Sequence, residues 1–227
     1  MGKKIFVGCL SYVLAALLVC ATANAGLLKG LVGGDKSAGG TTVSTDGLVQ
    51  AWTTVAKNYV KSTSLLVSSL ENAGAALGVK EEVVKKMAVA KSLTEGNLSK
   101  KDMEKIQESS KDLLALFNQK MSEVSPLKGQ SATLFGKSII DMTASLGLKA
   151  AVGLQATKLA KDSKDASKNV SLKDAGTMKD VVSGSAAVAI VVPVDIKLSK
   201  DILKSYVQYA KTHNIAVPNN ATKLLKD

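Results

Sequence analysis

Apolar residues recur at steps of three, four or seven along most of this chain, which is the spacing of one face of an α-helix. The first such stripe covers residues 45–77, where Thr45 or Asp46 can cap the helix and Gly78 marks its end. A second stripe covers residues 79–93, with glutamates early and lysines late, as the helix dipole prefers. We therefore expect two amphipathic helices in succession.

The next helix has the clearest start signal in the chain. Ser99 is followed three residues later by Asp102, a pattern typical of a capping box. Apolar residues then repeat down one side as far as Val124, the other side is mostly lysine, glutamate, glutamine and serine, and Pro126 ends the pattern. This pattern predicts a surface helix that packs on a core.

Residues 130–159 carry apolar side chains around most of the helical circumference and few charges. A helix of this kind is either central in a bundle or faces lipid. The following stretch, 160–180, is rich in lysine, aspartate, serine and alanine, and the sequence leaves open whether it is a hinge, a polar helix or a loop.

An uncharged run of 14 residues separates Asp180 from Asp195. A transmembrane helix needs about 20 apolar residues, so this run is too short to span a bilayer. Its β-branched residues suit a strand, but no partner strand is recognisable and a lone strand is unstable. We predict a buried helix over residues 178–191, ended by Pro193, with a short β pairing within 189–197 as the alternative.

A last amphipathic helix is expected to begin at Ser199 or Lys200 and to close before Pro218. Together these patterns predict an all-α fold, a helical bundle of about five to seven helices with an apolar central hairpin. The predicted organisation is one bundle domain at 45–218, preceded by a flexible Gly/Ser/Thr-rich lead-in at 26–44 and followed by a C-terminal tail at 219–227.

The first 25 residues have the three parts of a secretory signal peptide. Lys3 and Lys4 form the basic part, residues 5–19 the apolar part, and residues 21–25 read ATANA, which predicts cleavage before Gly26. Both cysteines lie inside this segment, so the mature chain has no disulfide framework. We expect export to the periplasm of a Gram-negative bacterium, or otherwise secretion.

Lysine supplies every cationic side chain, because the chain has no arginine. Without Lys3 and Lys4, 28 of the 30 cations remain against 19 acidic residues, a net charge of +9. Arginine provides the planar fork that reads phosphate and guanine, so its absence argues against nucleic-acid binding. A diffuse lysine field instead favours an anionic membrane surface or an acidic protein as partner, with a merely solvated basic surface as the alternative.

No catalytic, metal or cofactor signature stands out. The mature chain has no cysteine and one histidine, His213, which no nucleophile motif accompanies and which reads as a packing residue near a helix end. We therefore predict a non-enzymatic protein with no cofactor, no catalytic residues and no metal ligands.

The apolar centre suggests a binding role, since bundle interiors commonly hold apolar ligands. The sequence predicts an exported bundle that binds a lipid or other hydrophobic small molecule or associates with the cell envelope. The alternative is an interaction module that self-associates or captures a partner through its amphipathic helices, and the oligomeric state stays open. Candidate pocket-lining residues, each with plain core packing as its alternative, are Phe135, Ile139, Met142, Leu146, Val188 and Val191.

Overall fold

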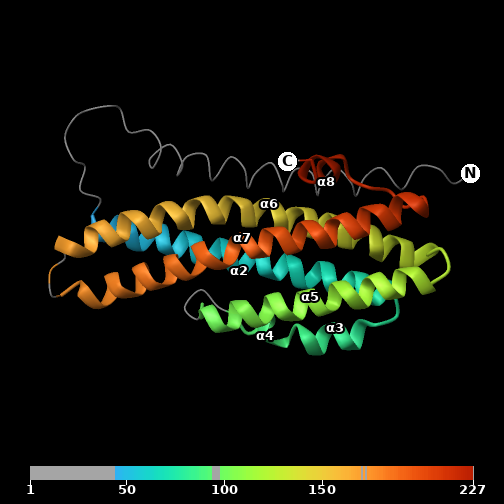
Figure 1. Ribbon diagram of the computed structural model, residues 1–227, viewed down its shortest axis with the longest axis horizontal. Coiled ribbons are helices and arrows are strands. Elements are labelled where there is room, and N and C mark those ends of the chain that lie inside the picture. Colours follow the sequence, from blue (N-terminus) through green and yellow to red (C-terminus); the bar gives the residue numbers. More distant parts are fainter. Residues whose placement is uncertain (1–43, 94–97, 170, 172, 227) are drawn as a thin grey trace, which may run out of the picture. The chain divides into compact units, whose positions relative to one another are not determined.

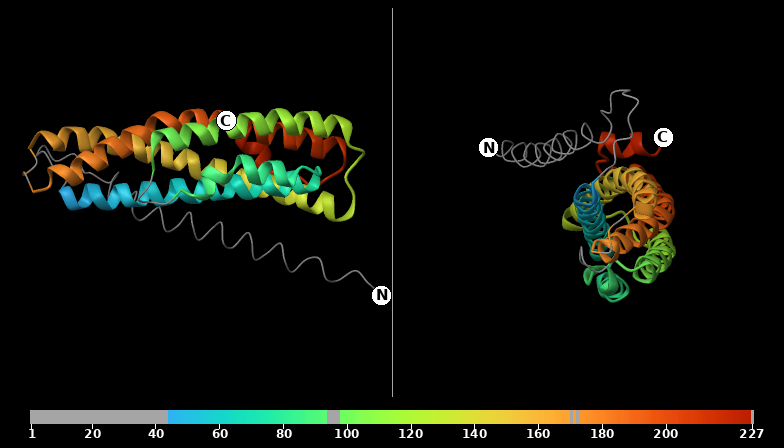
Figure 2. Two further views of the ribbon diagram at one scale, coloured as in Figure 1. Left: turned by 90° about the horizontal axis from the view of Figure 1, so that it is seen from below. Right: turned by 90° about the vertical axis from the view of Figure 1, so that its left-hand side faces the viewer.

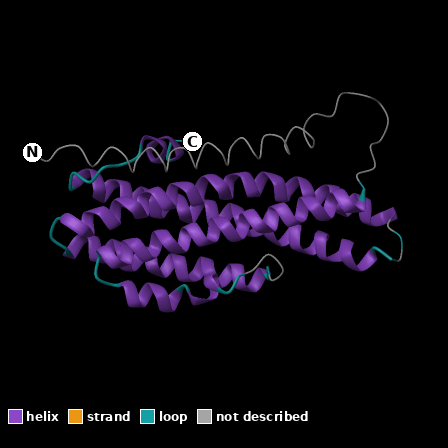
Figure 3. Ribbon diagram, turned by 180° about the vertical axis from the view of Figure 1, so that it is seen from behind, coloured by secondary structure: helices purple, strands orange, loops and turns teal. Residues whose placement is uncertain are grey.

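The computed structural model describes residues 44–93, 98–169, 171 and 173–226, and the predicted signal peptide and all of the predicted lead-in but Ser44 lie outside this part of the chain. The described residues form an all-α helical bundle without strands, which confirms the predicted fold class (Figures 1 and 3). In chain order, the helices are α2 (Thr45–Ala76), α3 (Lys80–Lys86), α4 (Ala88–Lys91), α5 (Lys100–Glu123), α6 (Gly129–Ala166), the 3₁₀ helix η1 (Ser167–Asn169), α7 (Ala175–Thr212) and α8 (Asn219–Leu224).

Serine residues bring α2 and α6 together. The Ser69 hydroxyl donates to the Ser138 carbonyl oxygen at 2.7 Å, and the Ser145 hydroxyl donates to the Ser62 carbonyl oxygen at 2.7 Å. All four serines are buried, and each pair on one helix is seven residues apart. Two small residues at heptad spacing let the helix backbones approach closely, and the crossed pairing shows that α2 and α6 run antiparallel.

Side-chain contacts also fix the directions of α5 and α7. Asp195 of α7 contacts both Tyr59 of α2 and Gln107 of α5. Ten residues after Gln107, Phe117 of α5 contacts Tyr206, which is eleven residues after Asp195 in α7. Thus α5 and α7 run parallel to each other and antiparallel to α6. The helices α2, α6 and α7 form the long core of the bundle, α5 packs along the C-terminal half of α7, and α3 and α4 cover α2 and α5 (Figures 1 and 2).

The capping prediction was right for α5, and for α2 the two predicted caps lie one and two residues after the observed one. The Ser99 hydroxyl accepts the Asp102 backbone N–H at 3.1 Å and donates to the Asp102 carboxylate at 2.6 Å. For α2 the capping side chain is Ser44, which accepts the Gly47 N–H at 3.2 Å, in place of Thr45 or Asp46. The stretch 79–93 divides at Met87 into α3 and α4.

The predicted end of the 178–191 helix at Pro193, before a separate helix from Ser199 or Lys200, is wrong, because α7 is one helix of 38 residues that includes Pro193. Proline removes one backbone donor from a helix, yet here the ring lies on the exposed side, where it displaces no packed neighbour. The Gln107 amide donates to the Val191 carbonyl oxygen at 3.0 Å, which supports the helix just before the proline. The alternative β pairing within 189–197 is also wrong, since these residues are helical throughout.

Helical structure also extends beyond the predicted limits at two places. Helix α6 runs on to Ala166, and η1 follows, so the first part of the 160–180 stretch is helical. The predicted C-terminal tail contains α8, whose Ala221 is buried. Helix α8 contacts both α6 and α7.

One glycine tests the close packing of α2 on α7. A methyl group at Gly184 would overlap the Trp52 ring, whereas a methyl group at Gly147, on the exposed side of α6, would meet nothing within 4 Å. We expect Gly184→Ala to destabilise the fold by about 1–3 kcal/mol and to shift the emission of Trp52, the only tryptophan, to longer wavelength. Gly147→Ala should instead stabilise α6 by roughly 0.5–1 kcal/mol. Urea unfolding followed by tryptophan fluorescence measures both, and equal stability of the two variants would contradict this packing.

Candidate functional site

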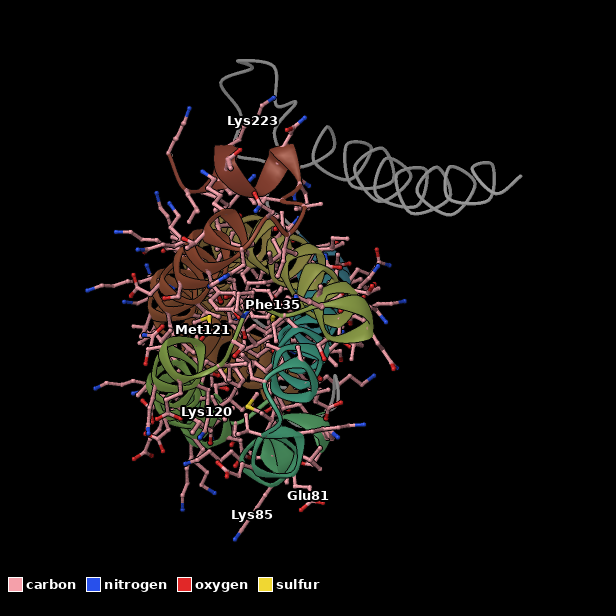
Figure 4. All side chains as sticks on the ribbon, turned by 90° about the vertical axis from the view of Figure 1, so that its right-hand side faces the viewer. Glu81, Lys85, Lys120, Met121, Phe135 and Lys223 are labelled. Carbon is pink, nitrogen blue, oxygen red and sulfur yellow. The ribbon has the colours of Figure 1, made fainter. Side chains whose placement is uncertain are left out.

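All six candidate pocket residues lie in the packed core. Their side chains are between 0 and 2 % exposed. Phe135 illustrates the environment, because its ring packs on Tyr206 at 5.2 Å and on Tyr209 at 5.0 Å between ring centroids. Figure 4 shows Phe135 pointing in among the helices while Lys85 points outward. The six residues are all core side chains, but the structure does not gather them in one place, because Phe135 packs on Tyr206 whereas Gly153 of the same helix packs on Val192, and a ligand among them stays a prediction.

The most unusual feature of the core is a polar cluster around Asp195. The Asp195 carboxylate accepts the Tyr59 hydroxyl at 3.1 Å and the Gln107 side-chain amide at 2.7 Å. The Lys149 ammonium group lies 3.8 Å from the same carboxylate and donates to the Ser199 hydroxyl at 3.3 Å. One carboxylate therefore links all four long helices, with one partner each from α2, α5 and α6.

Burial determines the electrostatics of this cluster. It lowers the pKa of Lys149, because removing an ammonium group from water disfavours its charged form, and the Asp195 carboxylate opposes that shift. Burial, and then the negative charge of Asp195, raise the pKa of Tyr59 far above its usual value. A buried lysine with a lowered pKa can act as a nucleophile, but the Lys149 side chain is only 2 % exposed. The geometry therefore indicates a structural ion pair.

The inward direction of these two charges leaves the outer side of the α6–α7 pair uncharged. Between Asp141 and Lys158, the only charged residue of α6 is Lys149, and between Asp180 and Lys197, the only one of α7 is Asp195. Both point into the bundle and face each other. The outward positions at this level consequently carry only uncharged side chains.

Large aliphatic side chains are exposed at this level. Leu154 of α6 is 79 % exposed, and Ile190 and Val194 of α7 are 60 % and 52 % exposed. Gly153 of α6 packs against Val192 of α7, so Leu154 and the α7 residues stand at the same height in the bundle. We call Leu154, Ile190, Val194 and the exposed Pro193 the outer apolar band. Ile190, Pro193 and Val194 are three and four residues apart and share one exposed face of α7, and apolar side chains grouped on an exposed face indicate an interaction site more strongly than single exposed residues do.

Lysines lie on both sides of the outer apolar band. Lys158 and Lys161 are exposed on α6, one to two turns beyond Leu154, and Lys197 and Lys204 are exposed on α7, beyond Val194. An apolar surface bordered by cations suits a partner that is apolar and negatively charged together.

Helix α7 is also the one helix, within the described part of the chain, that is long and apolar enough to cross a membrane. Core helices of soluble bundles meet the same criteria, and 33 % of the residues in its most apolar window are buried. The sequence argument against a span used the length of the uncharged run, whereas the helix itself is much longer than that run.

No group of three or more histidine, cysteine or acidic side chains that could hold a metal ion occurs among the described residues. The chain matches no known protein-family model, no curated protein and no solved structure. What can be said of its function accordingly comes from the polar cluster and the outer apolar band.

Sequence reasoning missed both of these features. It treated Lys149 as one of the few charges on a central helix and Asp195 as the end of an uncharged run. The signal that relates them was available, since each is the single charge in a long uncharged stretch and such a charge must be paired if it is buried. The prediction that α7 ends at Pro193 separated Asp195 from the helix to which it belongs.

Removal of Lys149 should reveal the free-energy cost of burying Asp195 without a cation beside it. We expect Lys149→Met to destabilise the protein by about 3–5 kcal/mol, because Asp195 is left buried without a cation. Adding Asp195→Asn should recover most of that loss, since a neutral amide can still bond to Tyr59 and Gln107. Urea unfolding followed by circular dichroism measures both variants. A single variant as stable as the parent, or a double variant no more stable than the single one, would contradict the pairing.

Proposed function

We propose that this protein is an exported, non-enzymatic helical bundle that associates with the cell envelope by docking on an anionic membrane surface. The observation that carries the proposal is the outer apolar band, with Leu154, Ile190 and Val194 each more than half exposed at one level of α6 and α7. Export is proposed from residues 1–25, which have the pattern of a signal peptide.

The band and its lysines suit the boundary between lipid headgroups and acyl chains. Apolar side chains gain about 0.8 kcal/mol for each CH₂ group removed from water. Lysines near an anionic leaflet contribute about 1 kcal/mol each. The exposed lysines on either side of the band can reach headgroup phosphates while the band itself lies against the acyl chains.

Docking on a lipid surface is better supported than a lipid enclosed inside the bundle. An enclosed ligand would need space beside Phe135 or Val188, and both side chains are fully buried among other core residues. The aliphatic side chains of the band are already exposed, so a membrane can contact them without any rearrangement of the core.

The alternative function, self-association or capture of a protein partner, uses the same band. A protein interface would bury Leu154 and Ile190 as well as a membrane does. The excess of lysine favours the membrane, because two copies of a basic surface repel each other.

Vesicle binding tests the proposal. The mature chain should co-sediment with vesicles that contain phosphatidylglycerol and should bind phosphatidylcholine vesicles much more weakly. Replacing Leu154, Ile190 and Val194 by serine should weaken binding by more than about a hundredfold, because roughly 1 kcal/mol of apolar transfer is lost at each position. Added salt should weaken binding further.

Val84→Ser provides the matched control, because Val84 of α3 is another exposed aliphatic residue, 37 % exposed, on a different part of the bundle. This variant should bind vesicles like the parent. Size-exclusion chromatography on the same samples separates the two functions. A triple variant that changes from dimer to monomer, in a protein that never binds vesicles, would overturn the membrane proposal and favour self-association.

A further inference from the structure

A second surface feature lies between the C-terminal halves of α5 and α7. It is an open groove of about 320 Å³, at the small end of the roughly 300–1,000 Å³ typical of ligand sites. Asn118 and Met121 line it from α5, and Ser205, Gln208, Tyr209 and His213 line it from α7. No lysine, aspartate or glutamate lines the groove, although exposed helix positions elsewhere in this protein are rich in all three.

The floor of the groove is the end of an aromatic cluster. The Phe117 and Tyr206 rings are 6.0 Å apart between centroids, Tyr206 and Phe135 are 5.2 Å apart, and Phe135 and Tyr209 are 5.0 Å apart. The cluster ends with the Tyr209 and His213 rings at 4.2 Å. Four of the six aromatic residues beyond residue 25, and the only histidine of the chain, thus gather in one place.

This cluster makes the groove rigid. Phe117, Phe135 and Tyr206 are fully buried, and Tyr209 is 7 % exposed, with its ring held between Phe135 and His213. His213 is partly exposed at the end of the cluster. The Tyr209 ring supports the His213 ring from behind, so His213 offers a stacking surface that is already held in place, which lowers the entropic cost of binding.

The hydrogen-bonding groups at the sides of the groove are available. The side-chain amides of Asn118 and Gln208 and the hydroxyl of Ser205 form no hydrogen bond with any other side chain or backbone group among the described residues. Each amide supplies both a donor and an acceptor, and the hydroxyl can do either. Asn118 and Gln208 are exposed and reach the groove from opposite helices.

From these observations we infer that the groove between α5 and α7 is a binding site for a neutral saccharide unit. A sugar ring has hydroxyl groups around its edge, which match the amides of Asn118 and Gln208 and the hydroxyl of Ser205. It also has a face of C–H groups, which can stack on the His213 ring and contact Met121. A charged ligand would find no counter-ion in the groove, and a purely apolar ligand would cover polar groups without satisfying them.

This inference goes beyond membrane docking, because the two sites use different residues. The outer apolar band lies near Val194 in the middle of α7, and the groove begins at Ser205 near its C-terminal end. One site can therefore fail its test while the other passes.

The test is a titration of the isotope-labelled mature chain with glucose and with N-acetylglucosamine, followed by NMR. Saturable changes in chemical shift should appear at millimolar sugar and centre on residues 118–122 and 205–213. The double variant Asn118→Ala/Gln208→Ala should weaken binding by at least about tenfold, through the loss of hydrogen bonds on both sides of the ring. His213→Ala should weaken binding by a similar factor while leaving the fold intact, because His213 is not a buried core residue.

Gln119→Ala is the matched control. Gln119 is the next residue on α5, but its amide donates to Glu123 at 2.7 Å and it does not line the groove. This variant should bind sugar like the parent. The inference is overturned if neither sugar gives saturable shifts at the groove, if the double variant binds as tightly as the parent, or if glucose 6-phosphate binds more tightly than glucose.

Discussion

Asp195 is the point at which the four long helices of this bundle meet. Its carboxylate is bonded to Tyr59 of α2 and Gln107 of α5, and it faces Lys149 of α6. A carboxylate in a core is costly unless its charge and its lone pairs are all compensated, and here each compensating group comes from a different helix. A shift of any helix along its axis would break one of these contacts, so the cluster specifies the register of the bundle. The close serine contacts between α2 and α6 depend on that same register.

The same interaction explains why part of the surface is apolar. Lys149 and Asp195 are the only charged residues in the central stretches of α6 and α7, and both are used inside. Had either side chain pointed outward, the band around Leu154 and Ile190 would carry a charge. The protein thus combines a polar group in the core with an apolar group on the surface, the reverse of the usual arrangement. Both halves of that inversion occur at one level of the bundle, which suits our proposal that a membrane covers the outer band.

The sequence predicts the helices well because their periodicity is strong and local. Capping by Ser99 is visible from two residues, and the burial of Phe135 and Val188 was expected because both lie in long stretches with few charges. Pro193 was misjudged because a proline's effect depends on its surroundings, and the Gln107 contact with Val191 just before it comes from a helix far away in sequence. Periodicity also shows only that a side chain faces inward. Whether the six candidate residues line a pocket or fill a core depends on packing between helices, which no single-helix pattern contains.

The exposed side of the bundle was harder to predict for a related reason. Helices that are apolar nearly all round have no evident outward face, so Leu154 and Ile190 looked like core residues until their neighbours were in place. The groove beside His213 was hidden in the same way, because its lining comes from two helices more than 80 residues apart in the chain. In both places the functional surface is a product of tertiary structure.

The central claim is that the outer apolar band contacts lipid, and a single labelled site tests it most directly. Residues 26–227 contain no cysteine, so Ile190→Cys and Val84→Cys each give one attachment point for a polarity-sensitive fluorophore. When vesicles containing phosphatidylglycerol are added, we predict a clear blue shift for the probe at position 190 and none for the probe at position 84. Equal shifts at both positions, or no shift at position 190 in a protein that sediments with the vesicles, would show that the membrane is bound through another surface and would contradict this account.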